Sequence, residues 1–274
     1  MPELPEVEVT LRGIAPVLKN SVIKSFVLRC EKLRTEISPA FKTLKDLKVL
    51  SYARRGKYIV ITTSSGFILL HLGMTGHLAV WAPNKAPNPG RHDHIDILLD
   101  SGYLIRFNDQ RRFGLFEWYP KPQDVYECKW LKVLGPEPLT DKFTGGILKQ
   151  SLARRKSPIK EVLMNSHVLV GVGNIYASEV LFRTKINPLT PACNISLDDC
   201  ERLVVAIKEI LTASIACGGT TIRDFSGADG KLGYFVGNLQ VYGHAGEACP
   251  LCGTKIEQKT LGGRSTFFCP HCQR

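Results

Sequence analysis

Two adjacent residues at the start of the sequence, Pro2 and Glu3, combine a candidate nucleophile with a carboxylate. Removal of Met1 would turn the nitrogen of Pro2 into a free secondary amine, and α-amino groups titrate near a pH of about 8, so a useful fraction is unprotonated at neutral pH. Such an amine attacks aldehyde-like carbons and forms an iminium intermediate. The same residues also suit the first turn of a helix, because proline fits the unpaired donor position and glutamate favours the helix dipole. Taken alone, the pair favours the helical interpretation, and its chemistry requires cleavage of Met1.

Four cysteines near the other end of the sequence have the spacing of a metal site. Cys249 and Cys252 form one Cys-x-x-Cys pair, Cys269 and Cys272 form a second, and sixteen residues separate the pairs. This spacing is typical of structural zinc sites, in which four thiolates surround one Zn²⁺ ion. The intervening residues 255–268 have the length of a β-hairpin. A tail of this size has too small a core to fold alone, so we expect one structural zinc ion to stabilise it.

Composition restricts the class of protein. The 274 residues are 44% hydrophobic, which is enough for one large core or, more readily, two smaller ones. A signal sequence and any run of about 18 apolar residues are absent, so we expect a cytoplasmic protein without a membrane span. Thiols stay reduced in that compartment, which disfavours disulfides or a redox dithiol for the paired cysteines. We interpret the remaining five cysteines as small core residues: Cys30, Cys128, Cys193, Cys200 and Cys217.

The net charge points to a polyanionic partner. The chain carries 36 basic and 25 acidic residues, a formal charge of +11. Nucleic acid is the usual partner for a basic protein of this size. An ordinary basic surface is common as well, so charge alone does not decide the matter.

The elements that must position these residues divide the chain into a β-rich first part and a helical second part. Residues 58–63 with 67–70, and 95–99 with 103–107, read as two hairpins of β-branched and apolar residues around tight turns. Residues 6–19 carry a loose apolar face of a helix that should pack on the sheet. This density of strands predicts a β-sandwich or barrel.

A break near residue 134 separates the two parts. Two prolines and a glycine in 134–138 interrupt any regular element. Beyond it, 144–163 and 196–217 are predicted helices, the second with Ser196 and Asp199 as a capping box. A Gly-x-Gly turn at 171–173 would expose backbone N–H groups to a phosphate at the start of another helix. We therefore expect three domains, at 1–134, 135–239 and 240–274.

Seven short motifs occur along the chain in addition to the cysteine finger. They are 1–8 (MPELPEVE), 54–58 (RRGKY), 71–74 (HLGM), 92–94 (HDH), 111–114 (RRFG), 171–176 (GVGNIY) and 240–243 (QVYG). In this order, and over the whole length, they make the chain resemble bacterial formamidopyrimidine-DNA glycosylases, which excise oxidised purines such as 8-oxoguanine and then cut the strand. The fold that this resemblance implies is α+β and multidomain: an N-terminal β-sandwich with flanking helices, a helix-two-turn-helix domain, and a four-cysteine zinc finger.

The resemblance also implies catalytic roles. Pro2 would attack C1′ of a damaged nucleotide turned out of the duplex, and Glu3 would protonate the sugar ring oxygen. Elimination would then break the strand on the 3′ side and next on the 5′ side, with Lys57 and Arg264 as the respective proton donors. Lys57 could instead belong to a solvated or phosphate-binding charge cluster, and Arg264 to a plain surface loop.

Further residues match DNA-contacting positions of the family. Met74, Arg111 and Phe113 match a wedge, the three side chains that fill the gap left by the extruded base and contact its orphaned partner. Core packing is the alternative for Met74 and Phe113, although the neighbouring glycines favour exposed loop tips. Residues 220–225 match the loop that closes over the damaged base. Five further matches are expected to contact DNA: His71, His92, Asn174, Tyr242 and Arg155. For His92, a metal site shared with His94 is the weaker alternative.

Two departures and two alternatives accompany the resemblance. Gln110 stands in place of an expected proline and Asn165 in place of an expected aspartate, and neither alters a proposed catalytic residue.

A pyrimidine-directed relative usually has glycine in place of Leu4 and lacks the wedge, which favours the purine enzyme. A non-enzymatic damage sensor would need no nucleophile beside an acid. We expect a monomer that acts on damaged double-stranded DNA.

Overall fold

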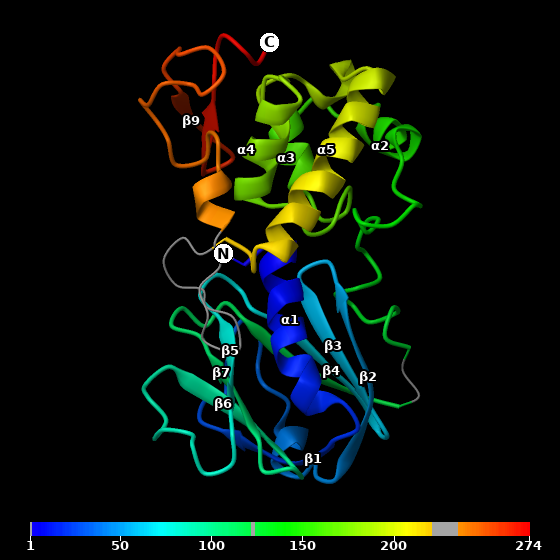
Figure 1. Ribbon diagram of the computed structural model, residues 1–274. Coiled ribbons are helices and arrows are strands. Elements are labelled where there is room, and N and C mark those ends of the chain that lie inside the picture. The colour runs from blue at the N-terminus through cyan, green and yellow to red at the C-terminus, as the bar shows by residue number, and fades with distance from the viewer. Residues whose placement is uncertain (1, 122–123, 221–234) are drawn as a thin grey trace. The chain divides into compact units, whose positions relative to one another are not determined.

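The computed structural model describes residues 2–121, 124–220 and 235–274. By the contacts between its residues, the chain divides into two compact units, 1–132 with 217–234 and 133–216 with 235–274. The predicted three-domain division at 1–134, 135–239 and 240–274 stays a prediction. Within the described ranges, no helix is both long and apolar enough to cross a membrane. The mixed α+β fold is confirmed: it has a large antiparallel sheet and a helical part, both visible in Figure 1, and a C-terminal cluster of four cysteines.

The first unit is built on eight antiparallel strands. Their order is β5-β7-β6-β1-β2-β3-β4-β8, and β1 meets β2 through only two residue pairs. β7 and β8 lie far apart in this order, yet the ring centroids of Phe107 and Phe116 are 6.5 Å apart. The sheet therefore folds back on itself around one core, as the predicted β-sandwich requires. The strands are β1 (Val22–Leu28), β2 (Leu47–Arg55), β3 (Tyr58–Thr63), β4 (Gly66–His71), β5 (His77–Trp81), β6 (Asp93–Leu99), β7 (Leu104–Asn108) and β8 (Leu115–Pro120).

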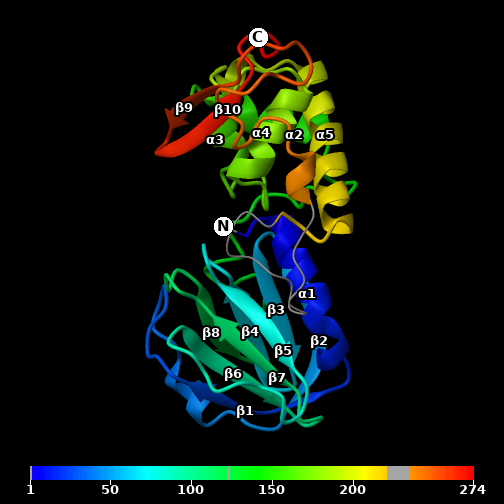
Figure 2. The same ribbon diagram turned by 60° about the vertical axis from the view of Figure 1, so that its left-hand side comes forward.

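Both predicted hairpins are confirmed, as β3–β4 and β6–β7. The predicted first helix is also present, as α1 (Leu4–Leu18). Its buried apolar residues recur every three or four positions, which makes one continuous face. This face packs on β2, β3 and β5, so α1 touches both halves of the folded sheet (Figures 1 and 2). A short 3-10 helix, η1 (Pro39–Lys42), lies between β1 and β2.

The second unit is mainly helical, and one prediction fails there. The single helix expected over 144–163 is wrong, because the chain forms α2 (Gly145–Leu152) and then α3 (Ile159–Leu163). Pro158 cannot donate a helical hydrogen bond and disfavours helical geometry at the residue before it, which explains the break. The helix predicted over 196–217 is confirmed as α5 (Leu197–Ala216), and Asp199 N donates to Ser196 Oγ at 3.0 Å. The remaining helices are α4 (Asn174–Arg183), η2 (Ala192–Asn194) and η3 (Phe235–Asn238).

The end of the chain folds as the predicted hairpin, β9 (Glu257–Leu261) and β10 (Arg264–Phe268). Its small core joins Ile256 and Phe267 to Phe182 of α4, so the hairpin is packed on the helices of the same unit. Figure 2 shows the two strands side by side.

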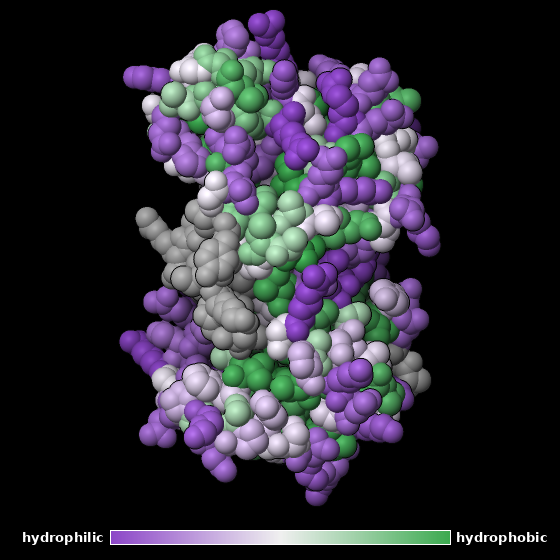
Figure 3. Space-filling model, viewed as in Figure 1, coloured by the Kyte–Doolittle hydropathy of each residue, from purple (hydrophilic) through white to green (hydrophobic). Residues whose placement is uncertain are grey.

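The unpaired cysteines fit the core interpretation only in part. Cys128 and Cys200 are buried as expected, and the half-buried Cys30 packs against the core of the first unit, whereas Cys193 and Cys217 are only half-buried. On the face drawn in Figure 3, hydrophilic side chains cover most of the visible surface and hydrophobic ones form interrupted patches.

Candidate active site and metal centre

Pro2 and Glu3 belong to the first unit. Pro2 is buried, and Glu3 is 1% exposed. Glu6 binds two backbone N–H groups with one carboxylate, since Glu3 N donates to Oε2 and Thr220 N donates to Oε1, each at 2.8 Å. A Cβ on Gly219 would lie 3.2 Å from Glu6 Oε1, and φ there is +83°, so glycine suits this approach. Glu6 therefore fixes the backbone beside the predicted nucleophile.

Two parts of the sequence prediction at this end lie outside the described residues. Met1 is one of them, and so are residues 221–225 of the loop predicted to close over the damaged base. Thr220, the first residue of that loop, is described and buried.

Lys57 lies in a two-residue turn between β2 and β3. Gly56, with φ of +58°, takes the first position of the turn, where glycine is favoured. Arg54 Nη1 donates to the carbonyl oxygen of Gly56 at 3.0 Å, and Arg54 Nε donates to Glu8 Oε2 at 2.9 Å. The arginine thus connects the turn that carries Lys57 to α1, the helix that follows Pro2 and Glu3.

His71 is neutral in this fold. Removal of its ring from water, assisted by the positive charges of Lys57 and Arg34, lowers the pKa of His71 from 6.5 to about 3. Its Nδ1 accepts a hydrogen bond from Gly73 N at 2.9 Å, which leaves the proton of the neutral ring on Nε2. This geometry suits donation to a phosphate oxygen without a charge.

The predicted wedge residues, Met74, Arg111 and Phe113, occupy two adjoining turns. Met74 is 38% exposed and Phe113 is 46% exposed, so core packing does not hold them. Arg111 Cζ lies 4.8 Å from the centre of the Phe113 ring. A Cβ on Gly73 would lie 2.5 Å from Gly114 N, which shows how closely the two turns approach. The structure therefore brings the three wedge residues together at exposed positions.

The histidine pair does not form a metal site. His92 is half-buried, whereas His94 is buried with its Nε2 at 2.9 Å from the backbone oxygen of Asp109. Among the described residues, the cysteine cluster is the only group of three or more candidate metal ligands.

The other predicted residues belong to the second unit. Arg264 is exposed at the start of β10, directly after a Gly262-Gly263 turn in which both glycines have positive φ. Asn174 Nδ2 and the buried Lys160 Nζ each donate to the carbonyl oxygen of Ser265 at 2.9 Å, which anchors the strand beside Arg264. The helices of this unit therefore set the position of the hairpin.

Arg155 and Tyr242 are half-buried in the same unit. Arg155 Nε donates to the carbonyl oxygen of Ser151 at 2.9 Å. The Tyr242 ring lies 5.1 Å from that of Phe267, and its backbone N–H donates to Glu179 Oε1 at 2.8 Å. Both residues thus have defined positions in the second unit.

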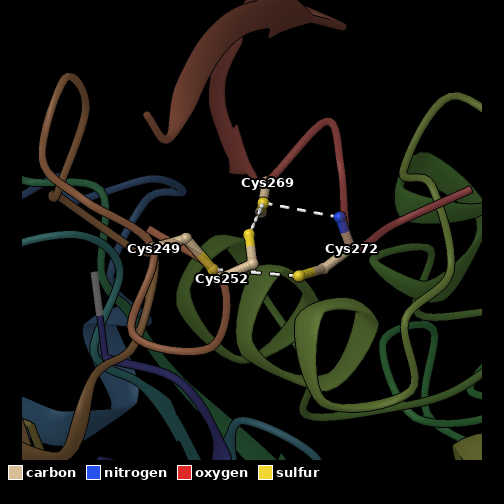
Figure 4. Close-up of side chains that lie close together, drawn as sticks. All are labelled: Cys249, Cys252, Cys269 and Cys272. Carbon is tan, nitrogen blue, oxygen red and sulfur yellow. Dashed lines mark hydrogen bonds between the residues drawn. The ribbon is translucent and has the colours of Figure 1, made fainter. Parts of the chain in front are cut away.

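The four finger cysteines converge. Their Sγ atoms all lie within 4.8 Å of one another, and Figure 4 shows them pointing inward from two chain segments. The pKa of the Cys252 thiol is lowered to about 6, mainly by a hydrogen bond with the Thr254 hydroxyl. Four thiols at this separation match the donor set and the size of a tetrahedral zinc site.

The buried carboxylates that the sequence did not reveal include three that bind backbone N–H groups near predicted site residues: Glu6, Asp109 and Glu179. Glu179 accepts hydrogen bonds from the backbone N–H groups of residues 240, 241 and 242, at 2.9, 3.1 and 2.8 Å. Its only sequence signal is a charged residue within the apolar run of α4. That signal does not reveal the partners, because they lie about sixty positions further along the chain.

Comparison with known proteins places the whole chain in one family. Residues 1–116 match the formamidopyrimidine-DNA glycosylase N-terminal domain, 134–226 its H2TH domain, and 246–274 the zinc finger found in FPG and IleRS. The formamidopyrimidine-DNA glycosylase of Serratia proteamaculans (strain 568) is 48% identical over 274 residues and all of both chains.

Solved structures agree with the sequence matches. The wild-type Lactococcus lactis Fpg with DNA that contains N7-benzyl-Fapy-dG has a TM-score of 0.90 and 32% identity, over all of both chains. The complex of the Lactococcus lactis Fpg with DNA that contains an abasic site has the same TM-score and identity, over 99% of both chains. With matches to all three domains and identity close to half over the full length, the chain belongs to the formamidopyrimidine-DNA glycosylase family.

Proposed function

We propose that this protein is a base-excision repair enzyme that removes oxidised purines from duplex DNA and then cleaves the abasic strand. The observation that carries the proposal is the buried pair Pro2 and Glu3, whose backbone is held where Glu3 N donates to the Glu6 carboxylate. The chain that contains this pair matches DNA glycosylases over its full length. Related structures in complex with DNA that contains N7-benzyl-Fapy-dG or an abasic site support the substrate class.

In the proposed reaction, the Pro2 amine attacks C1′ of the extruded nucleotide and the bond from C1′ to the base breaks. Glu3 protonates the ring oxygen as the sugar opens, which leaves an iminium between Pro2 and C1′. Loss of a C2′ proton then expels the 3′ phosphate, and a second elimination expels the 5′ phosphate. Lys57 and Arg264 supply the protons of these two steps.

The other predicted residues serve DNA binding in this proposal. The wedge fills the gap in the duplex, and His71, His92, Arg155, Asn174 and Tyr242 hold the backbone. One zinc ion on the four cysteines fixes the finger that presents Arg264, and the ion takes no part in the chemistry. The protein acts as a cytoplasmic monomer.

Borohydride trapping tests the proposal. The protein is incubated with duplex DNA that contains 8-oxoguanine opposite cytosine, reduced, and digested, and mass spectrometry locates the sugar adduct. We expect the adduct on the nitrogen of Pro2 in a peptide that lacks Met1. A Pro2→Gln variant that retains Met1 should give no adduct, whereas Pro5→Ala, which alters a proline without a terminal amine, should trap normally.

Two results would contradict the proposal. An adduct on Lys57, or none with an intact wild-type protein, would exclude the Pro2 mechanism. Faster trapping on a duplex that contains an oxidised pyrimidine would reassign the substrate to the other branch of the superfamily.

A further inference from the structure

Asp109 is a fully buried carboxylate at the junction of the two turns that carry the wedge. It directly follows β7 and is 0% exposed. A buried carboxylate is costly unless hydrogen bonds satisfy it, so its partners indicate what it does.

Those partners come from both turns. Asp109 Oδ1 accepts a hydrogen bond from Thr75 Oγ1 at 2.6 Å, and Thr75 directly follows Met74. Asp109 Oδ2 accepts from Gly114 N at 2.7 Å, and Oδ1 lies 3.3 Å from Arg111 N. Thr75 Oγ1 also accepts from Arg111 N at 3.1 Å. One carboxylate therefore connects the backbone on either side of Phe113 to the turn that bears Met74.

The backbone at this junction needs such a restraint. Arg112 has φ of +55°, a left-handed conformation that is unfavourable for a residue other than glycine. A turn with this geometry persists only when its surroundings specify it. The Asp109 backbone adds to the anchor, since its N–H donates to the His92 carbonyl oxygen and its own carbonyl oxygen contacts His94.

We infer that Asp109, acting with the Thr75 hydroxyl, is a positioning residue that holds Met74, Arg111 and Phe113 in the arrangement needed to replace an extruded base. This inference rests on the proposed function. Asp109 touches no reacting atom, so its loss should impair extrusion of the base and spare the chemistry at Pro2.

The test compares Asp109→Asn with Asp100→Asn. The amide keeps the shape of the side chain but presents a donor where Asp109 accepts from three groups. Asp100 is a matched control, because its Oδ1 also accepts two backbone N–H bonds, from Val22 and Ser101, in the turn at the far end of the β6–β7 hairpin. Base release is measured under single turnover on duplex DNA with 8-oxoguanine, and strand cleavage on a single-stranded abasic oligonucleotide, which has no stacked base to extrude.

We expect Asp109→Asn to slow base release from the duplex by at least about tenfold, as the loss of hydrogen bonds to a buried charge implies. Cleavage of the single-stranded abasic substrate should change by less than about twofold. The fluorescence of 2-aminopurine placed opposite the lesion should rise less when Asp109→Asn binds the duplex than when the wild type binds it. Asp100→Asn should resemble the wild type in all three measurements.

A second pair of variants protects against misfolding of Asp109→Asn. Thr75→Val removes the hydroxyl at nearly constant volume and should show the same selective defect in smaller size, whereas Thr75→Ser should restore wild-type rates. Equal losses on both substrates, or no loss on the duplex, would overturn the positioning role. Failure of the proposed function is distinguishable, because the wild type itself would then leave both substrates intact.

Discussion

Arg54 Nε lies 2.9 Å from Glu8 Oε2, and this ion pair joins the turn that bears Lys57 to helix α1. The Arg54 side chain is 11% exposed and that of Glu8 is 20% exposed, so water screens the pair less than a surface ion pair. The pair restrains the Lys57 turn, which carries the proposed proton donor, against α1, the helix that follows the proposed nucleophile Pro2.

Arg54→Lys should therefore affect strand cleavage more than base release. Lysine cannot bind Glu8 and the Gly56 carbonyl oxygen at once with the arginine geometry, so the Lys57 turn loses one restraint. We expect cleavage of an abasic duplex to slow by about tenfold, as measured by quenched-flow gel assays, and base release to change by less than about threefold. Arg12 also forms an ion pair with Glu8, but the Arg12 side chain is 63% exposed. Arg12→Gln should therefore change neither rate. Equal slowing of both steps in Arg54→Lys would indicate a role in DNA binding instead.

The lowered pKa of His71 makes a prediction about acid stability. Its folded pKa of about 3 lies below the ordinary 6.5, so protons bind the unfolded chain first. The free energy of unfolding therefore decreases as the pH falls from about 6.5 towards 3, by up to about 1.4 kcal/mol per pH unit. His71→Gln should flatten this part of the profile, measured as the urea midpoint between pH 7 and pH 4. The exposed His167→Gln is the control and should leave the profile unchanged.

A neutral His71 also predicts how DNA affinity responds to salt. A charged phosphate contact contributes about 0.9 to the slope of log affinity against log salt concentration, and an uncharged one contributes nothing. Arg155→Gln should reduce the slope by about this amount, while His71→Gln weakens binding at every salt concentration without changing the slope. Fluorescence anisotropy with a lesion duplex from 50 to about 250 mM salt measures both. A reduced slope in His71→Gln would contradict the neutral assignment.

Zinc removal should unfold the finger and spare the first unit. The finger core contains few apolar side chains besides two of the cysteines themselves, so metal binding must supply much of its stability. We expect one zinc ion per chain by atomic absorption. Chelation should raise the dissociation constant for lesion DNA by at least about a hundredfold and leave the hydrogen exchange of β3 and β4 protected. Cys269→Ser should reproduce this, whereas Cys193→Ser, at a cysteine outside the cluster, should bind zinc and DNA normally.

Glu179 should be important for the stability of the second unit. Burial raises the pKa of its carboxyl group, and three backbone N–H groups oppose that effect by stabilising the charged form. Glu179→Gln replaces one acceptor oxygen by a donor, and we expect a loss of about 1.5–3 kcal/mol in urea unfolding followed in this unit. Glu209→Gln, which breaks an exposed ion pair with Arg183, should cost less than about 1 kcal/mol. A loss of similar size in both variants would show that the three hydrogen bonds matter little.

The elements that could be predicted from the sequence are those set by residues close together in the chain. The hairpins β3–β4 and β6–β7 follow from alternating apolar residues around short turns, and α5 from its Ser196 cap and terminal glycines. The cysteine cluster follows from spacing alone, because two Cys-x-x-Cys turns can meet around one ion. The continuous helix over 144–163 was wrong because apolar periodicity outweighed the local effect of Pro158.

Three buried carboxylates could not be predicted from the sequence, because their burial and at least one partner of each depend on the fold. Asp109, Glu179 and Glu6 look like ordinary surface carboxylates in the sequence, and only the fold shows that each is buried against backbone N–H groups. Val241 N, which donates to Glu179, lies 62 positions from it, and Thr220 N, which donates to Glu6, lies 214 positions from it. These three residues support positions that motifs did identify, so the sequence indicated where chemistry would occur better than what holds it in place.

The double hydrogen bond of Glu6 has a consequence for the order in which the protein is made. Its partners Glu3 and Thr220 stand at opposite ends of a long stretch of chain. A ribosome releases Pro2 and the whole β-sandwich before it releases Thr220. Until Thr220 is made, Glu6 Oε1 lacks the hydrogen bond that the Thr220 N–H donates to it. The amino terminus is therefore among the first segments to be synthesised and among the last to reach its final geometry.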